Sequence, residues 1–345
     1  MSYCFSGLER AFGAPVGRGV IKQQTADFIV DEIMPVEPSG EGEHLWLWIR
    51  KTASNTEWVA RQLARVADVR PRDVSYAGLK DRQAITSQWF SIHLPGREDP
   101  DLTRLDSDEF EVLRASRHDR KLRRGAHSGN RFSLRIRQLE ADPVSLQQRL
   151  QQIRDQGVPN YFGTQRFGHD MQNLVQAEQL FSGARLSVSK HQRGLYLSAA
   201  RAWVFNQYLS QRVSQGCWNR PLAGDVFQLQ GKSACFVDDG SADLSSRIES
   251  LDIHPTGPLW GRGELLSEAD CRDQELQLAE QYPAFCAGLE KAGMKQERRA
   301  LRLLAEQMDW QLEAEDVLRV SFNLPAGAFA TMVMRELLSV DEAVS

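Results

Sequence analysis

The loop at residues 78–82 holds the most chemically suggestive side chains of this sequence. It places one carboxylate, Asp81, between two cations, Lys80 and Arg82. Neighbouring positive charge favours the ionised form of an aspartate, and an ionised, positioned carboxylate can act as a base or as a nucleophile. The alternative is an ordinary charged turn in which the aspartate serves backbone hydrogen bonding. Spacing alone favours the turn, so a catalytic role needs further support.

A second segment, residues 127–132, offers groups that recognise RNA bases. It contains Asn130 and Phe132 in a basic neighbourhood. Amides read the edges of bases, and aromatic rings stack on unpaired bases. The alternative is structural: Asn130 caps a turn and Phe132 begins a core strand, and these residues alone favour that interpretation. Phe329, within residues 326–330, is by default a packing residue.

Positive charge gathers between Arg114 and Arg137, although the whole chain has a formal net charge of −4. Nine lysines and arginines face one acid, Asp119, in that stretch. A local excess of basic residues binds phosphate backbones by releasing counterions. The alternatives are a solvated loop and pairing with acidic stretches of the same chain, and charge alone leaves all three open. The densest part of the block consists of Arg120, Lys121, Arg123 and Arg124.

The composition is typical of a folded protein with one large domain or two. The 345 residues are 41% hydrophobic and 26% charged, which excludes a disordered chain and a small disulfide scaffold. No apolar run approaches the length of about 18 residues that a membrane span needs, and the first ten residues show no secretory signal. The five cysteines form no CxxC pair, which fits free thiols in a reducing cytoplasm.

Two classes of site have no support in the sequence. Residues 163–168 space two glycines like a phosphate-binding loop, but His169 and Asp170 follow where a Walker A motif needs a lysine and a hydroxyl residue. The seven histidines include no HExxH or HxxxH pair, so the ligand spacing of a helical metal site is missing. The sequence predicts neither a P-loop nucleotide site nor a metal centre.

Strands and helices follow one another without regular alternation. Alternating or branched apolar residues predict strands, and apolar residues at helical spacing predict helices. Residues 54–57 fit a capping box at the start of one helix. The expected strands are 27–32, 45–49, 74–77, 87–94, 132–137 and 317–322, and the expected helices are 59–66, 146–153, 195–213, 265–307 and 331–338. This order predicts an α+β fold with mostly antiparallel pairing.

Several longer blocks of the chain resemble the TruD family of tRNA pseudouridine synthases. The loop of Asp81 lies within YAGLKDRQAITSQWF at residues 76–90, which is similar to the catalytic loop and following strand of that family. Ordered blocks of this length are more specific than any short motif, and they favour functional roles for Asp81, Asn130 and Phe132. The other similar blocks, in family order over nearly the whole chain, are 42–45, 51–56, 129–132, 158–168, 197–201, 205–207 and 324–331.

The resemblance implies an isomerase that converts a uridine of tRNA to pseudouridine, with Asp81 as the catalytic carboxylate. In bacterial members the target is uridine 13 of the D-arm, chiefly in glutamate tRNA. The target nucleotide would be flipped into a pocket, where Phe132 would stack on it. No cofactor or metal is implied, and a cytoplasmic monomer with tRNA as its partner is expected. Substrate contacts are implied for Lys80, Arg82, Asn130, Phe132 and Phe329, and phosphate contacts for Arg120, Lys121, Arg123 and Arg124.

The family resemblance also implies a discontinuous domain organisation. A catalytic domain with a mixed, largely antiparallel sheet is expected at 1–157 and 304–345, an inserted α/β domain at 158–303, and the RNA site in the cleft between them. Two other functions stay open: an RNA-binding module in which catalysis is secondary, and a basic-patched protein that binds other proteins. The Lys80–Asp81–Arg82 loop favours the enzyme, since binding alone needs no carboxylate beside RNA phosphates.

Overall fold

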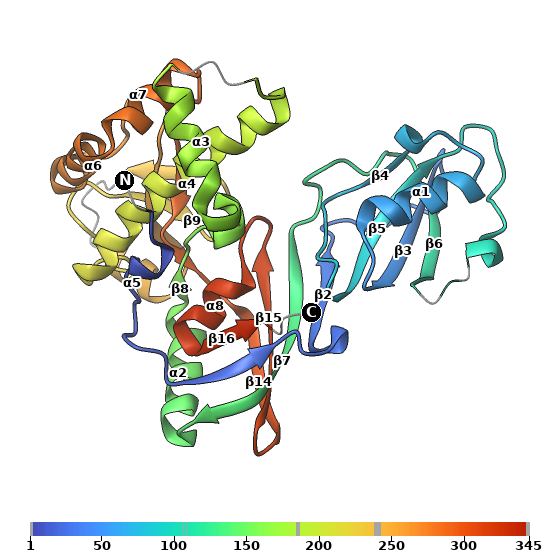
Figure 1. Ribbon diagram of the computed structural model, residues 1–345, viewed down its shortest axis with the longest axis horizontal. Coiled ribbons are helices and arrows are strands. Elements are labelled where there is room, and N and C mark those ends of the chain that lie inside the picture. Colours follow the sequence, from blue (N-terminus) through green and yellow to red (C-terminus); the bar gives the residue numbers. More distant parts are fainter. Residues whose placement is uncertain (1–2, 106, 108, 184–186, 238–242, 343–345) are drawn as a thin grey trace. The chain divides into compact units, whose positions relative to one another are not determined.

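A computed structural model describes residues 3–105, 107, 109–183, 187–237 and 243–342. Its contacts divide the chain into two compact units, each assembled from separate stretches of sequence (Figure 1). The predicted division into a catalytic domain at 1–157 and 304–345 and an insertion at 158–303 stays a prediction. The sheet unit comprises Val16–Leu146, Ala305–Gly327 and Leu338–Ser345, and the helical unit comprises Met1–Pro15, Gln147–Leu304 and Ala328–Leu337.

The sheet unit is built on one ten-stranded sheet. Its main path runs in the order β14-β15-β7-β2-β5-β3-β6, and β1, β4 and β16 pair at its sides. Only two of the described pairings, β2 with β5 and β1 with β16, are parallel. The predicted α+β class with a mixed, largely antiparallel sheet is therefore confirmed. The strands are β1 Gly17–Ile21, β2 Phe28–Ile33, β3 His44–Thr52, β4 Val74–Tyr76, β5 Ile85–His93, β6 Phe110–His118, β7 Gly129–Ala141, β14 Glu306–Ala314, β15 Val317–Pro325 and β16 Ser339–Glu342.

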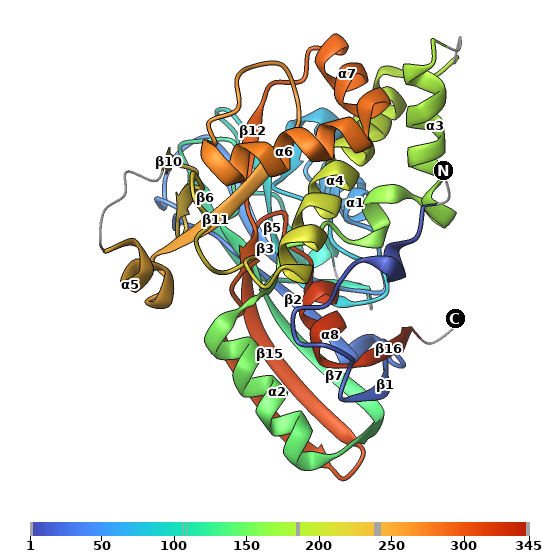
Figure 2. The same cartoon turned by 90° about the vertical axis from the view of Figure 1, so that its left-hand side faces the viewer.

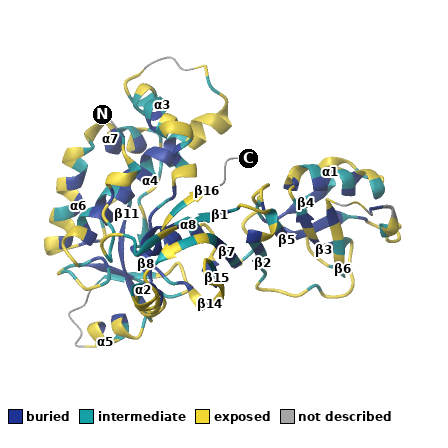
Figure 3. Cartoon of the chain, turned by 60° about the horizontal axis from the view of Figure 1, so that its bottom comes forward, coloured by how far each residue is buried: buried dark blue, intermediate teal, exposed yellow. Residues whose placement is uncertain are grey.

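Two hydrophobic clusters cover opposite faces of β3, because successive side chains of a strand point to opposite sides. Leu45 and Leu47 lie in a cluster with Val59 and Leu63 of helix α1, Thr56–Val66. Trp46, between those leucines, lies in a second cluster with other aromatic and aliphatic side chains. Figure 3 shows the resulting burial of β3 and β5 and the exposed outer side of α1. Both faces of these strands are therefore held, which fixes the loops that follow them.

The helical unit packs around α4, Lys190–Ser214. This helix contacts α3, α6, α7 and β11 (Figure 2), and it starts with a capping box formed by Ser189 and Gln192. The other helices are α2 Pro143–Gln156, which starts in the sheet unit, α3 Gln172–Phe181, α5 Leu244–Glu249, α6 Ala269–Gln281, α7 Pro283–Lys291 and α8 Ala330–Leu337. The strands are β8 Val158–Pro159, β9 Val226–Leu229, β10 Cys235–Val237, β11 Ile253–Leu259, β12 Glu297–Ala300 and β13 Arg302–Leu303. Within the described part of the chain, no helix is both long and apolar enough to span a membrane.

Three details of the expected elements are wrong. The capping box at 54–57 does not form, because α1 begins at Thr56 and the Ser54 hydroxyl donates to the carbonyl of Glu109 instead. The expected helical stretch 265–307 holds helices only as far as Lys291, and β12 and β13 follow. Strands β6 and β14 were not expected, since few residues of either strand are buried and no clear apolar alternation results.

Candidate active site

The loop that carries Asp81 has no regular secondary structure, yet its backbone is held at several points. The carbonyl of Gly78 accepts a hydrogen bond of 3.0 Å from the side-chain amide of Gln88 on β5. The backbone N–H of Lys80 donates to the hydroxyl of Thr56 over 3.1 Å. Thr56 in turn donates to Gln88 over 2.9 Å, so both anchors belong to one buried polar group. The loop is thereby fixed against α1 and β5.

A third anchor is the buried ammonium group of Lys51, at the end of β3. The residue has no exposed surface, and its Nζ donates to the carbonyls of Ser54 at 2.7 Å and of Asp81 at 2.8 Å. Burial lowers the pKa of Lys51 to about 8, although the charge of Asp81 acts in the opposite direction. Lys51 was not predicted individually as a site residue, although a fully buried lysine is an unusual placement.

The carboxylate of Asp81 is open to solvent on one side and faces a lysine on the other. Its side chain is 43% exposed, and its Oδ2 lies 3.9 Å from Nζ of Lys22, whose own side chain is only 8% exposed. Lys22 follows β1 directly, and its Nζ lies 4.8 Å from the centre of the Phe28 ring. Lys22 was not predicted as a site residue, since no local motif connects it with residue 81.

The two cations that flank Asp81 in sequence have other contacts. Lys80 forms an ion pair of 2.9 Å with Glu32, and both side chains are buried. Glu32 also accepts a hydrogen bond from the backbone N–H of Trp89. Arg82 is exposed, and its Nε donates to the carbonyl of Ala53 over 3.4 Å. The recorded ion-pair contact of Asp81 is therefore with Lys22.

Phe132 lies in the same unit and is linked to Asp81 through Lys22 and Phe28. On β7 it stands opposite Val30 of β2 and Phe322 of β15. Its ring centre is 6.3 Å from that of Phe28 and 5.7 Å from that of Phe322, and 8% of the residue is exposed. Phe132 is thus a core residue of β7. Its neighbour Phe28 contacts Lys22, and Lys22 in turn faces the carboxylate of Asp81.

Asn130, two residues earlier on the same strand, stands opposite Glu32 and Leu324. Its Oδ1 is buried and accepts no hydrogen bond from the residues that the structure describes. The ring Nδ1 of His127 is also buried without a partner among the described residues. The pKa of His127 is lowered, mainly by burial and to a lesser extent by the charge of Lys80. Buried polar atoms without partners are costly and uncommon in folded proteins. Other buried atoms elsewhere in the described residues share this status, but these two are the ones that lie within residues 127–132, the segment that the sequence singled out.

The basic block splits into a paired flank and an unpaired centre. Most of its outer arginines form ion pairs with acids of the sheet unit, as expected if basic residues pair with acidic stretches of the same chain. Arg120 contacts its neighbour Asp119 at 3.3 Å. Lys121, Arg123 and Arg124 have no ion pair in the part of the chain that the structure describes. The flanking pairs are Arg114–Glu37, Arg117–Asp99, Arg135–Glu313 and Arg137–Asp27.

The centre of the basic block, residues 119–126, lies against the segment that leads into the Asp81 loop. Leu122 is almost fully buried and belongs to the cluster of Trp46 and Trp89. The backbone N–H of Gly125 donates to the carbonyl of Ala77 over 2.8 Å. We call residues 119–126 the basic loop. Its hydrogen bond to Ala77 attaches it to the end of β4, the strand that precedes the loop of Asp81.

Phe329 belongs to the helical unit, whereas the other candidate residues belong to the sheet unit. A Cβ atom placed on Gly163 would lie 3.4 Å from the Phe329 ring, so the glycine leaves just enough room for that ring. This contact joins two of the blocks that suggested the family, 158–168 and 324–331. A substrate contact for Phe329 stays a prediction.

Comparison with known proteins shows the family. The model of the family tRNA pseudouridine synthase D (TruD) matches residues 11–172 and 169–337. A tRNA pseudouridine synthase D of Hydrogenovibrio crunogenus is 52% identical over 330 residues, covering 96% of this chain and 95% of that protein. One from Pseudomonas aeruginosa strain PAO1 is 48% identical over 331 residues, with 96% and 93% covered.

A solved structure agrees at the level of the fold. The crystal structure of a candidate tRNA pseudouridine synthase D from Methanosarcina mazei superposes with a TM-score of 0.73 over 96% of this chain and 95% of that one, at 20% identity. The family model spans nearly the whole chain, and the identity to the bacterial relatives is high over the same length. The chain therefore belongs to the tRNA pseudouridine synthase D (TruD) family.

Proposed function

We propose that Asp81 supplies the catalytic carboxylate with which this member of the family converts a uridine of tRNA to pseudouridine. The observation that carries the proposal is the state of this side chain. It is 43% exposed, while the loop beneath it is fixed by Lys51, Thr56 and Gln88. A carboxylate that is accessible and held in place is what attack on a ribose requires, because positioning contributes much of the rate in such reactions.

The reaction is a redox-neutral rearrangement that needs no external electron donor. The N1–C1′ bond breaks, the uracil turns within the site, C5 bonds to C1′, the proton on C5 leaves, and N1 ends protonated. Asp81 either attacks C1′, forming and later releasing an ester, or removes the proton from C2′ and later returns a proton to it. Both routes need the same carboxylate beside the sugar, and both stay open. Among the described residues, no group of three or more His, Cys, Asp or Glu side chains is placed to hold a metal ion.

The neighbours of Asp81 suggest how the substrate is held. A uridine inside a helix is out of reach, so the nucleotide must be flipped out of its stack. Phe132 would then stack on the uracil. The Oδ1 of Asn130, which has no hydrogen-bond partner among the described residues, would accept a hydrogen bond from the uracil. Lys80, Arg82 and Phe329 are proposed as further substrate contacts, with Lys80 acting through its ion pair with Glu32.

The RNA is proposed to be tRNA, and the target is uridine 13 of the D-arm, chiefly of glutamate tRNA. The protein is proposed to act as a cytoplasmic monomer. The basic loop supports a polyanionic partner, because Lys121, Arg123 and Arg124 carry charges that no acid of the described residues neutralises. Together with Arg120 they form the proposed phosphate surface. Phosphate contacts of this kind orient a nucleic acid without reading its sequence.

The replacement Asp81→Asn tests the proposal most directly. It keeps the size of the side chain and removes the nucleophile or base, so we expect pseudouridine formation on an unmodified tRNA transcript to fall by at least about 1,000-fold, the scale on which removing a covalent catalyst acts. Affinity for the transcript should stay within a few fold, since Asp81 opposes RNA phosphates rather than attracting them.

Asp309→Asn is a matched control, because Asp309 is also an exposed aspartate of the sheet unit, 4.0 Å from the guanidinium of Arg319. That variant should keep the parental rate. Pseudouridine formation by Asp81→Asn at a rate close to the parent would overturn the catalytic assignment. Loss of RNA affinity together with activity would instead favour a binding role for this residue.

A further inference from the structure

A pocket of about 560 Å³ opens in the sheet unit beside strand β4, between helix α1 and the basic loop. Among the described strands, β4 pairs with β5 alone, so its other edge is free of a neighbouring strand. None of Asp81, Asn130 and Phe132 lines the pocket, which makes it separate from the candidate active site. Its lining consists of Glu57, Ala60, Arg61, Pro71, Val74, Ser75, Tyr76, Lys121, Leu122, Arg123 and Arg124.

The rim of this pocket carries four cations and one acid. Arg61 comes from α1, and Lys121, Arg123 and Arg124 come from the basic loop, so two separate elements bring positive charge to one place. Lys121 donates to the carbonyl of Arg72 over 3.3 Å, and no ion pair within the described residues neutralises any of the four. A cleft lined by charges of one sign raises the local concentration of counterions, so this rim favours an anionic ligand.

The floor of the pocket is apolar and aromatic rather than charged. Ala60, Val74 and Leu122 are buried there. The guanidinium of Arg124 lies 5.2 Å from the centre of the Tyr76 ring and donates to the Tyr76 hydroxyl over 3.3 Å. Arginine and tyrosine planes are the surfaces on which unpaired RNA bases stack. The volume is in the range of small-ligand sites and leaves room for a base and a sugar besides a phosphate.

We propose that this pocket binds an unpaired nucleotide of the RNA substrate other than the nucleotide that reacts. Its phosphate would lie between Arg61 and the cations of the basic loop, and its base against the Tyr76–Arg124 pair. The inference rests on the proposed function, because it takes the substrate to be RNA. Tyr76 ends the strand that leads into the Asp81 loop, and Gly125 of the basic loop is bonded to Ala77. A nucleotide bound in the pocket would therefore hold the RNA in register with the catalytic carboxylate.

The first test compares Arg61→Gln with Arg65→Gln. Both arginines are exposed on α1, one turn apart, but only Arg61 lines the pocket. For Arg61→Gln we expect tRNA affinity to fall by about threefold to tenfold and the salt dependence of binding to lose about one unit of slope, as for one lost phosphate contact. Arg65→Gln should bind as the parent does. Equal binding by the two variants would overturn the proposal.

Two further variants distinguish a nucleotide pocket from a diffuse basic surface. Glu57→Gln removes the only acid of the rim and should strengthen tRNA binding by about twofold to threefold, since screened surface charges act with this size. Ala60→Leu narrows the apolar floor without changing the charge, and it should weaken binding to a similar extent if a base or sugar enters. Binding unaffected by Ala60→Leu would show that phosphate alone is held at the rim, which contradicts the proposal. If thermal melting shows that Ala60→Leu does not fold, Pro71→Leu at the exposed rim serves the same comparison.

Binding and catalysis are measured separately so that the two proposals fail in different ways. Affinity is measured by fluorescence anisotropy with unmodified tRNA in the Asp81→Asn background, where no product forms. The rate of pseudouridine formation is measured separately, at saturating tRNA, in variants that keep Asp81. If the parent protein forms no pseudouridine but the pocket variants change tRNA affinity as expected, the proposed function is refuted and the pocket is supported. Normal activity with no effect of Arg61→Gln or Ala60→Leu would refute the pocket alone.

Discussion

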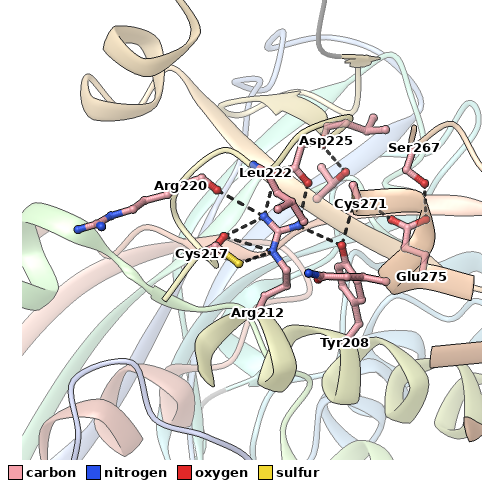
Figure 4. A network of polar contacts seen from close by, with 12 residues as sticks. Tyr208, Arg212, Cys217, Arg220, Leu222, Asp225, Ser267, Cys271 and Glu275 are labelled. Atoms are coloured by element: carbon pink, nitrogen blue, oxygen red, sulfur yellow. Dashed lines mark hydrogen bonds and ion pairs between the residues drawn. The ribbon is translucent and has the colours of Figure 1, made fainter. Parts of the chain in front are cut away.

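The helical unit holds a buried arginine, Arg212, and the sheet unit holds a buried lysine, Lys51, and the two cations have different partners. Arg212 lies on α4 with a fully buried side chain, and its guanidinium bonds to both oxygens of the equally buried Asp225 at 2.8 and 2.9 Å (Figure 4). It also donates to the hydroxyl of Tyr208 and to the carbonyl of Cys217. Burial opposes its charge, but the bond to Asp225 outweighs that effect and raises the pKa of Arg212.

The network of Arg212 continues to a second buried ion pair. The Tyr208 hydroxyl lies 3.4 Å from the sulfur of Cys271, whose thiol points to Glu275 at 3.6 Å. Glu275 is paired with Arg298 at 2.7 Å, and both side chains are buried. Every charge in this group has an opposite charge beside it. The group fixes α4 and α6 to the loops and strands around them.

The surroundings of Lys51 are different. Its ammonium is bonded to two backbone carbonyls, and no carboxylate of the described residues lies within ion-pair distance of it. One of those carbonyls belongs to Asp81, whose carboxylate is 43% exposed. The comparison concerns these two cations alone: the one with a carboxylate partner lies in a network that serves stability, and the one bonded only to carbonyls lies under the candidate catalytic loop.

The largest effect on stability should follow Arg212→Met. It leaves Asp225 buried without its partner, and breaking one side of a buried ion pair costs about 3–5 kcal/mol. We expect the free energy of unfolding in urea to fall by that amount, while the rate of pseudouridine formation per folded molecule stays at the parental value. The double variant Arg212→Met with Asp225→Leu should recover part of the loss. A large drop in kcat in molecules that remain folded would contradict the structural role.

Lys51→Met should affect both stability and activity. The carbonyls of Ser54 and Asp81 lose their donor, and a buried polar group without a partner costs about 1–3 kcal/mol. Because Asp81 is then less well placed, we expect kcat to fall by about 10- to 100-fold, with tRNA affinity within a few fold of the parent. Arg50→Met, on the neighbouring exposed position of β3, is the control. If kcat in the folded Lys51→Met variant equals that of the control, Lys51 does not position Asp81.

Phe132→Leu should have a smaller effect, confined mainly to turnover. It keeps a buried apolar side chain beside Phe28 and Phe322 but removes the stacking surface, which is worth about 1–3 kcal/mol per base. We expect kcat to fall by about tenfold with little change in initial tRNA binding, and Phe132→Tyr to restore most of the rate. A variant that loses binding affinity but keeps kcat would contradict the stacking role.

Sequence patterns predicted much of the fold and only part of the site. The strands around Leu45 and Phe132 and the helix at 195–213 were expected because apolar periodicity is local information, and the exposed strand β14 was missed because it has little of it. The loop of Asp81 and the segment of Asn130 were identified from contiguous motifs. Lys22 and Lys51 escaped because their relation to Asp81 depends on the pairing of distant strands. The acidic partners of the outer arginines of the basic block could not be predicted for the same reason, since some of them, such as Glu313, lie far away in the sequence.

The pH dependence of stability provides the finest test of the difference between the two buried cations. The pKa of a lysine in an unfolded chain is about 10.4, whereas burial lowers that of Lys51 in the folded protein to about 8. Between these values the unfolded chain keeps a proton that the folded chain has released, so the contribution of Lys51 to stability rises with pH. Below pH 8 both states hold the proton, and the penalty for burying the charge is fully present.

The unfolding free energy of the parent minus that of Lys51→Met should therefore be flat from pH 6 to about 7 and rise towards pH 10. For Arg212 the pKa is raised instead, so the same difference with Arg212→Met should not change over this range. Parallel curves for both comparisons would mean that Lys51 keeps its proton throughout, and the two cations would then differ in their partners but not in their charge.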